Sequence, residues 1–208
     1  MEHLNEHMSN GTPPDMDKAM ARYIFELGHL KSTPRTGWTL AGISNPESVA
    51  DHSFRTALIG VLLAYEEGAD PARTALICLF HDTTETRLGD IPSVGKKYLR
   101  ESPEEVVADQ TRDLPGGLAE LISGLVSDYS SYSGLEAQLA KDADKLECLA
   151  QAVEYVESGS IQANAWITAL EKEISSASGL RLAAAIQEIP PSQWWKHFVE
   201  NYRGTPIF

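Results

Sequence analysis

The chain has 208 residues, enough for one domain with a sizeable core, and nothing in its length argues for dividing it. Apolar residues make up 42% of the chain, but no stretch approaches the roughly eighteen apolar residues of a membrane span, so we expect no membrane partner. The formal net charge of -13 would repel the phosphates of a nucleic acid, whose binding depends on Lys and Arg. We therefore expect no nucleic-acid partner and a small-molecule substrate instead.

Residues 1–15 are polar, include Pro13 and Pro14, and lack the apolar segment of a secretory signal, so we interpret them as a flexible leader. A cytoplasmic location follows from this interpretation. The remainder, residues 16–208, is expected to form one domain. Cys78 and Cys148 each lie in an apolar helical pattern outside any CxxC motif, which favours buried reduced thiols over a disulfide.

Helical patterns recur along the chain, and no alternating strand is bounded by hairpin turns, so the predicted fold class is all-α with about eight helices. The first helix is expected over residues 16–31, and a long loop follows to Asn45. Asn45 and Pro46 resemble a helix start, because Asn can cap and Pro fits the first helical position. We expect this second helix to carry His52 and to be buried on two sides. Its apolar stripes are Phe54, Ala57, Leu58, Val61, Leu62 and Tyr65, and His52, Thr56, Ile59 and Leu63.

The third helix is predicted to begin at Asp70-Pro71, to be apolar all round over residues 75–80, and to end in His81 and Asp82. Capping boxes at residues 102–105 and 133–136 predict two further helix starts. The second of these opens a long helix that reaches about residue 157. Shorter helices follow, and the pair Trp194-Trp195 near the end is expected to serve packing rather than a cofactor, with a subunit interface as a further role.

His81 and Asp82 lie where an apolar helix ends, and burying either side chain costs several kcal/mol unless it is paired or bound to a metal. On the dipeptide alone, a core histidine beside a solvated helix end is the favoured interpretation. His52 on the preceding helix, and Asp142 or Asp144 on the long helix, change this. Four nitrogen and oxygen donors can then converge on one divalent ion. The helical pattern does not decide between the two aspartates.

In their order along the chain, these residues resemble the HD-domain metal-dependent phosphohydrolases, and above all their 5'-deoxynucleotidase branch. The resemblance spans roughly residues 20 to 160, and the stretches that carry it are Pro34-Arg35-Thr36-Gly37-Trp38, residues 46–53, 81–85, 89–92 and 141–144. It implies a single-domain helical bundle of the HD type. It also implies an enzyme that hydrolyses deoxynucleoside 5'-monophosphates to the deoxynucleoside and phosphate. Relatives are often dimers, so a homodimer is among the implied states.

The resemblance implies one divalent metal ion, with the ligands His52, His81, Asp82 and Asp144. Asp144 is preferred to Asp142 because the family pattern places its aspartate three residues after a lysine, as Asp144 stands after Lys141. Two His and two Asp ligands favour Mn²⁺, Co²⁺, Fe²⁺ or Zn²⁺ over Ca²⁺, with Mg²⁺ as a further candidate.

Three more residues match functional positions of the family. Glu85 matches its essential acid and, one helical turn after Asp82, can exchange a proton at the site; a surface glutamate is the alternative. Asp90 matches an acid that orients the attacking water or the sugar, or else it caps a helix. Arg35 matches a phosphate-binding arginine, whose planar guanidinium can grip two oxygens, or else it is an ordinary surface residue.

Two further candidates have weaker support. Trp38 fits a base-stacking wall and core packing equally well, because Thr36 and Gly37 separate it from Arg35, whereas in some relatives an aromatic residue follows the arginine directly. Lys96, with its neighbour Lys97, either adds positive charge at the mouth of the site or is simply solvated.

Three other functions are alternatives for such a chain. A diiron oxygenase of the HD type needs additional histidines before the last aspartate, yet no histidine lies between His81 and His197. A non-enzymatic helical module would be expected to have lost Glu85 or a ligand, and none is missing. Hydrolysis of another small phosphate ester, such as a cyclic or analogue nucleotide, stays open.

Overall fold

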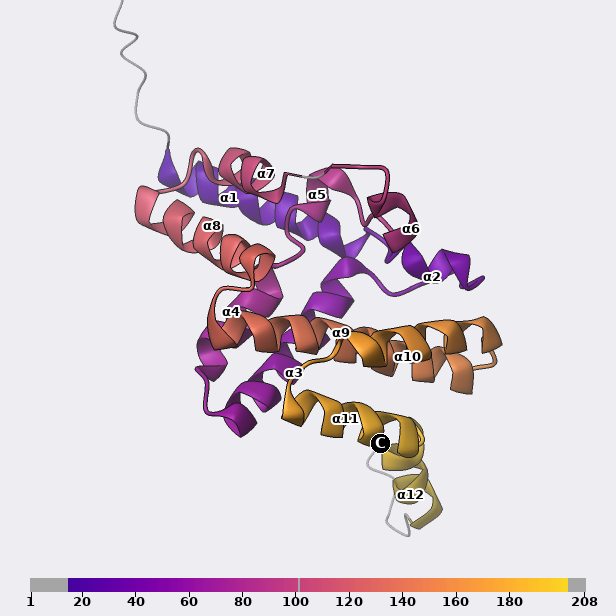
Figure 1. The fold of residues 1–208 in the computed structure, drawn as a ribbon. Helices are drawn as coiled ribbons and strands as arrows, with labels where there is room; N and C mark the ends of the chain where they lie inside the picture. The colour runs from indigo at the N-terminus through magenta and orange to yellow at the C-terminus, as the bar shows by residue number, and fades with distance from the viewer. Residues whose placement is uncertain (1–14, 101, 202–208) are drawn as a thin grey trace, which may run out of the picture.

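The computed structural model describes residues 15–100 and 102–201, which fold as helices joined by loops (Figure 1). The helices, in chain order, are α1 (Met16–Gly28), η1 (His29–Lys31), α2 (Gly37–Leu40), α3 (Val49–Glu67), α4 (Pro71–Phe80), α5 (Glu85–Leu88), α6 (Ser93–Lys96), α7 (Pro103–Thr111), α8 (Gly116–Ser131), α9 (Gly134–Glu157), η2 (Ile161–Ala163), α10 (Asn164–Leu170), η3 (Glu171–Glu173), α11 (Ala177–Glu188) and α12 (Gln193–Asn201). In the described part of the chain, the only β pairing is an isolated bridge between Pro34 and Ser48. The predicted all-α class is confirmed. The helices outnumber the eight or so expected, because α2, α5 and α6 are single turns that leave too short a pattern to detect.

Helix α9 runs through the middle of the bundle, where α3 and α4 pack on it together with α10 and α11 (Figure 1). The side chains of Leu63, Ile77, Leu139 and Leu146 are almost wholly buried between these helices. Each such side chain contributes roughly 1.5–3 kcal/mol through its removal from water. A second apolar cluster joins α1 to α7 and α8. The packed trio of α3, α4 and α9 is the frame that positions the polar site.

Helix α3 begins later than predicted. Ser48 is its N-cap, and Ser48 and Asp51 form a reciprocal capping box, so two free backbone N-H groups are satisfied there. The predicted start at Asn45-Pro46 is wrong, because residues 47–49, which follow it, first run beside residues 33–35. The N-H of Arg35 donates to the carbonyl of Glu47 at 3.0 Å, which brings the arginine to the start of α3.

The other predicted helix starts are confirmed, but two of the caps are not. Asp70 caps α4 by accepting from the backbone N-H groups of residues 72 and 73, as its Asp-Pro sequence predicts. Helices α7 and α9 begin after Ser102 and Ser133, yet neither serine side chain makes a capping hydrogen bond. The carboxylate of Glu136 accepts from the N-H of Asp70 instead, so a tertiary contact replaces the expected local one.

The expectation that the second helix is buried on two sides is wrong. Helix α3 is buried on one side only: Ile59 and Leu63 face α4 and α9, whereas the stripe that begins with Phe54 is solvent-exposed apart from Ala57. No described helix packs over that stripe. Trp194 does not pack inside the core either: it is 81% exposed, on helix α12 at the edge of the bundle (Figure 1). Its role at a subunit interface stays a prediction.

None of the helices in the described ranges is long and apolar enough to cross a membrane. Cys78 and Cys148 are both buried free thiols, as predicted. The leader expected over residues 1–15 lies, except for Asp15, outside the described residues, and the single-domain boundary stays a prediction.

Candidate active site

Three helices bring two histidines and two aspartates together. His52 comes from α3, His81 and Asp82 directly follow α4, and Asp144 comes from α9. The Nε2 atom of His52 lies 3.2 Å from Asp144 Oδ1 and 3.8 Å from Asp82 Oδ2, and His81 Nε2 lies 3.1 Å from Asp82 Oδ2. The four residues predicted as ligands are therefore neighbours in the core, with His52 beside both aspartates and His81 beside Asp82.

The two imidazoles are held in a defined orientation. His81 Nδ1 donates to the carbonyl of Cys78 at 2.6 Å, and His52 Nδ1 lies 2.5 Å from a carboxylate oxygen of Glu147. With a proton on each Nδ1, each Nε2 carries a lone pair. Both Nε2 atoms are buried without a hydrogen-bond partner.

This donor set has a surplus of negative charge and of lone pairs. Burial alone would lower the pKa of His52, and Arg35 also lowers it, yet contacts with Asp144, Cys148 and Glu147 raise that pKa well above its usual value. Either a proton on the His52 imidazole or a bound divalent cation would neutralise part of this excess negative charge. The cluster of His and Asp side chains can thus hold a metal ion, since each residue offers a ligand atom of the type that such ions bind.

The two candidate aspartates of α9 have different surroundings. Asp142 accepts from the backbone N-H groups of Ser175 and Ser176, at 3.0 and 2.7 Å, and so holds the segment that leads into α11. Asp144 accepts from the Tyr129 hydroxyl at 2.8 Å through Oδ2, which leaves Oδ1 facing His52. Of the two, the structure brings only Asp144 to the histidines.

We predict different results for two matched substitutions. Asp144→Asn should lose the bound metal, because an amide oxygen is a much weaker ligand than a carboxylate. Asp142→Asn should keep the metal and lower the free energy of unfolding by about 1–3 kcal/mol, because its amide nitrogen cannot accept the backbone N-H that one carboxylate oxygen of Asp142 accepts. Elemental analysis and chemical denaturation measure the two effects, and metal loss in Asp142→Asn alone would move the site by two residues.

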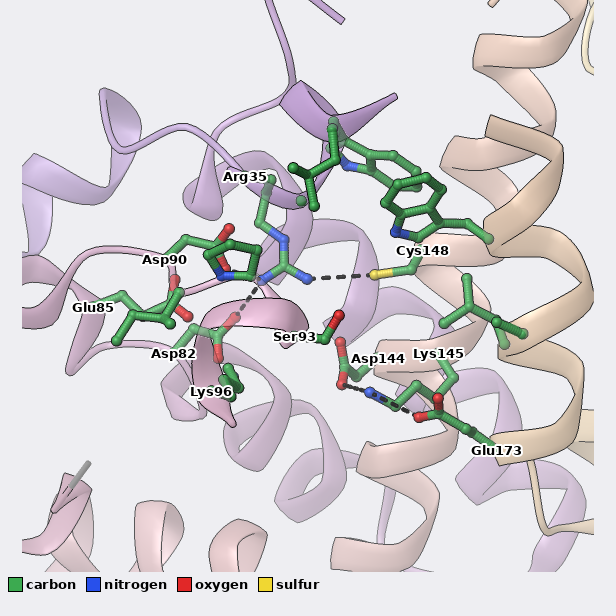
Figure 2. A pocket seen from close by; sticks show the side chains of 18 of the residues that line it. Arg35, Asp82, Glu85, Asp90, Ser93, Lys96, Asp144, Lys145, Cys148 and Glu173 are labelled. Atoms are coloured by element: carbon green, nitrogen blue, oxygen red, sulfur yellow. Dashed lines mark hydrogen bonds and ion pairs between the residues drawn. The ribbon is translucent and has the colours of Figure 1, made fainter. Parts of the chain in front are cut away.

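Arg35 is a largely buried residue of the site, not an ordinary surface arginine. Its Nη1 lies 3.2 Å from Asp82 and 3.2 Å from Asp90, and its Nη2 lies 3.4 Å from Cys148 Sγ, as Figure 2 shows. Asp90 also accepts from the backbone N-H and the hydroxyl of Thr36, at 2.5 and 2.8 Å. Asp90 therefore ties the loop of Arg35 to the loop that follows α5.

Glu85 opens the short helix α5, and its backbone N-H donates to the carbonyl of Asp82 at 3.0 Å. The side chain is 8% exposed, and its Oε2 atom is buried without a hydrogen-bond partner. Burial raises the pKa of Glu85 to about 9, and the negative charges of Asp82 and Asp90 contribute to this. Glu85 is thus not a surface glutamate, and its surroundings favour the protonated form of its carboxyl.

One pocket of about 530 Å³, within the usual size range of sites for small ligands, is lined by Arg35, Asp82, Glu85, Asp90 and Asp144, whereas the two histidines lie behind its wall. Trp38 lines it too, but only 3% of this residue is exposed, and its Nε1 donates to Glu47 at 2.9 Å. Core packing therefore accounts for most of its surface. Lys96 lies at the wall of the pocket with its side chain exposed, whereas Lys97 is not part of the lining.

Sequence reasoning missed several residues of the site, three of which are the most informative. Glu147 is fully buried and holds both His52 and Arg55, whose Nε donates to it at 2.8 Å. Its spacing of three residues from Asp144 on one helix was an available signal. Tyr129, which donates to Asp144, and Trp166, which lines the pocket, come from α8 and α10, and no pattern linked them to the site.

Known proteins resemble this chain over most of its length. The family model described as HD domain matches residues 27–183, which include every residue predicted for the site. The 5'-deoxynucleotidase hdd1 of Schizosaccharomyces pombe is 38% identical over 136 residues, which cover 62% of this chain and 68% of that protein. The 5'-deoxynucleotidase HDDC2 of Homo sapiens is 30% identical over 141 residues, 66% of this chain and 69% of that protein.

Solved structures agree with this relationship. A conserved hypothetical protein from Pyrococcus furiosus is 35% identical and superposes with a TM-score of 0.66, over 81% of this chain and 99% of its own. The PH0347 protein from Pyrococcus horikoshii, 28% identical, gives a TM-score of 0.67 over the same shares. The chain therefore belongs to the HD domain family and is related to proteins described as 5'-deoxynucleotidases.

Proposed function

We propose that this protein is a metal-dependent 5'-deoxynucleotidase, which hydrolyses deoxynucleoside 5'-monophosphates to the deoxynucleoside and phosphate. The observation that supports this most is the contact of two histidine Nε2 atoms, neither with a hydrogen-bond partner, with the carboxylates of Asp82 and Asp144. These two carboxylates line a pocket together with Arg35 and Glu85. The descriptions of the relatives in Schizosaccharomyces pombe and Homo sapiens supply the substrate class.

The proposed ligands of a single divalent ion are His52, His81, Asp82 and Asp144. Mn²⁺, Co²⁺, Fe²⁺ and Zn²⁺ suit this set of nitrogen and oxygen donors, and Mg²⁺ is a further candidate. When bound, such an ion polarises a phosphoryl oxygen and lowers the pKa of a water molecule. The chain's own part is to hold both imidazoles with Nε2 free, through the carbonyl of Cys78 and the carboxylate of Glu147.

Arg35 is proposed to bind the phosphate of the substrate. Its guanidinium neutralises charge on the phosphoryl oxygens, and this interaction strengthens as charge develops in the transition state. Asp90 positions that guanidinium and anchors Thr36, and this is the role we propose for it in place of direct proton transfer. Lys96, exposed at the wall of the pocket, adds positive charge where the anion enters.

Glu85 is proposed to be the general acid. Hydrolysis breaks the bond between phosphorus and the 5'-oxygen, and the departing oxygen needs a proton. A carboxyl that is still protonated at neutral pH can supply it, and the neighbouring carboxylates of Asp82 and Asp90 favour that protonated form.

One screen tests the proposed activity. Metal-depleted protein is supplied with Mn²⁺, Co²⁺, Mg²⁺ or Zn²⁺ and incubated with deoxy- and ribonucleoside 5'-monophosphates, and the released phosphate is measured. Release from deoxynucleotides with at least one metal is the expected result. No release from any deoxynucleotide with any of these metals would reject the proposal. The homodimer and the cytoplasmic location stay predictions.

The hydrogen bond between Glu147 and His52 gives a further prediction. Glu147→Gln should weaken metal binding about ten- to a hundredfold, the usual effect of removing the carboxylate that holds a metal-binding histidine. The dissociation constant of the metal is measured by competition with a chelator. Glu154→Gln is a suitable control, because Glu154 also pairs with Arg55 but does not contact His52. Equal metal affinity in the two variants would contradict the role given to Glu147.

A further inference from the structure

The pocket of the active site has two chemically different parts. One part holds the charged groups of the site, among them Arg35, Asp82 and Asp144. The other is lined by apolar side chains of the short helices α2 and α10, namely Leu40, Ala165, Trp166, Ala169 and Leu170. A ligand that fills both parts therefore needs an anionic end and an apolar end.

In the apolar part of the pocket, Trp166 is the aromatic residue whose ring is still accessible to a ligand. It is half-buried, whereas Trp38 beside it is only 3% exposed. The two indole rings lie with their centroids 5.6 Å apart and their planes 39° from parallel. One side of the Trp166 ring thus packs on Trp38, and the rest of the ring lines the pocket.

The support behind Trp166 is fixed. The indole N-H of Trp38 donates to Glu47 at 2.9 Å, and its ring meets the edge of Tyr155 with the centroids 5.2 Å apart. Tyr155 in turn accepts from the backbone N-H of Glu47 at 3.0 Å. Because these contacts hold Trp38 in place, Trp166 can bind a flat ring with little loss of side-chain freedom.

We propose that the nucleobase of the substrate stacks on Trp166 of α10, and that Trp38 is the support behind this residue and not the stacking surface itself. This inference rests on the proposed function. If the phosphate lies at Arg35, the base is the apolar end that remains to be placed. Since every nucleobase has a π face, Trp166 selects for the presence of a base and discriminates little among bases.

The test compares substrates with and without a base. For Trp166→Leu, the KM for deoxyadenosine 5'-monophosphate and deoxycytidine 5'-monophosphate should rise roughly five- to a hundredfold, the range for loss of one base-aromatic stack. The effect on 2-deoxyribose 5-phosphate should be clearly smaller, because this ester has no ring to stack. Trp166→Phe keeps an aromatic face and should retain most of the affinity. Trp194→Ala is the control, since Trp194 lies outside this pocket.

The outcomes separate this inference from the proposed function. If the wild-type protein hydrolyses deoxynucleotides but Trp166→Leu has an unchanged KM, the stacking role is rejected and the proposed function stands. If the wild-type protein releases no phosphate, the proposed function is rejected. Calorimetry with deoxyadenosine then still tests the stacking, because equal affinity of wild type and Trp166→Leu rejects it. Circular dichroism confirms that both Trp166 variants are folded.

Discussion

Replacing His81 or Asp82 with alanine is expected to release the metal ion and to abolish phosphate release. The two residues are adjacent and offer a nitrogen and an oxygen 3.1 Å apart, so the loss of either opens one side of the cluster. The ligands that remain cannot enclose an ion. Elemental analysis of the purified variants measures the metal, and released phosphate measures the activity.

Folding must be checked separately in these variants. Asp82→Ala also removes a partner of Arg35, although Asp90 still pairs with the same Nη1 atom. The variant should therefore fold, with a lower melting temperature once the stabilisation by bound metal is lost. An Asp82→Ala protein that is fully loaded with metal and active would contradict the proposed site.

Local chemistry made the main helices predictable. The start of α4 needs only Asp70 and the proline after it, and the long helix α9 follows from its apolar pattern. The caps failed where a distant partner competes, as when Glu136 binds the N-H of Asp70 and leaves Ser133 without a capping role. A helical wheel also detects an apolar stripe without showing what covers it, and so the stripe of α3 that begins with Phe54 was wrongly placed in the core.

In the site, too, local sequence chemistry predicted some residues, whereas others depend on tertiary contacts. His81 and Asp82 could be found because charge at the end of an apolar helix is costly unless something binds it. Asp144 could be preferred to Asp142 only through the family pattern, since the hydrogen bonds of Asp142 to residues 175 and 176 depend on tertiary packing. Trp166 reaches the pocket only because α10 packs on α9, a contact that no local pattern encodes.

Glu85→Gln is expected to keep its metal and its fold while losing catalytic rate. The glutamine has the same size and removes only the proton that we assign to the leaving 5'-oxygen. Loss of a positioned general acid lowers kcat by roughly a hundred- to ten-thousandfold. The KM should change little, because Arg35 and the apolar part of the pocket bind the substrate in both proteins. Single-substrate kinetics with deoxyadenosine 5'-monophosphate, with metal content checked, measure this split.

The pH profile distinguishes this role from a structural one. A general acid must be protonated, so kcat of the wild type should fall as the pH rises through the pKa of Glu85. Without a cation this pKa is about 9, and a nearby cation lowers it, so the decline should begin at or below pH 9. Glu85→Gln should lack that decline over the same range. If Glu85→Gln keeps a near-normal kcat, or if its kcat still falls at alkaline pH as in the wild type, the proton comes from another group. Asp90 would then be the next residue to substitute.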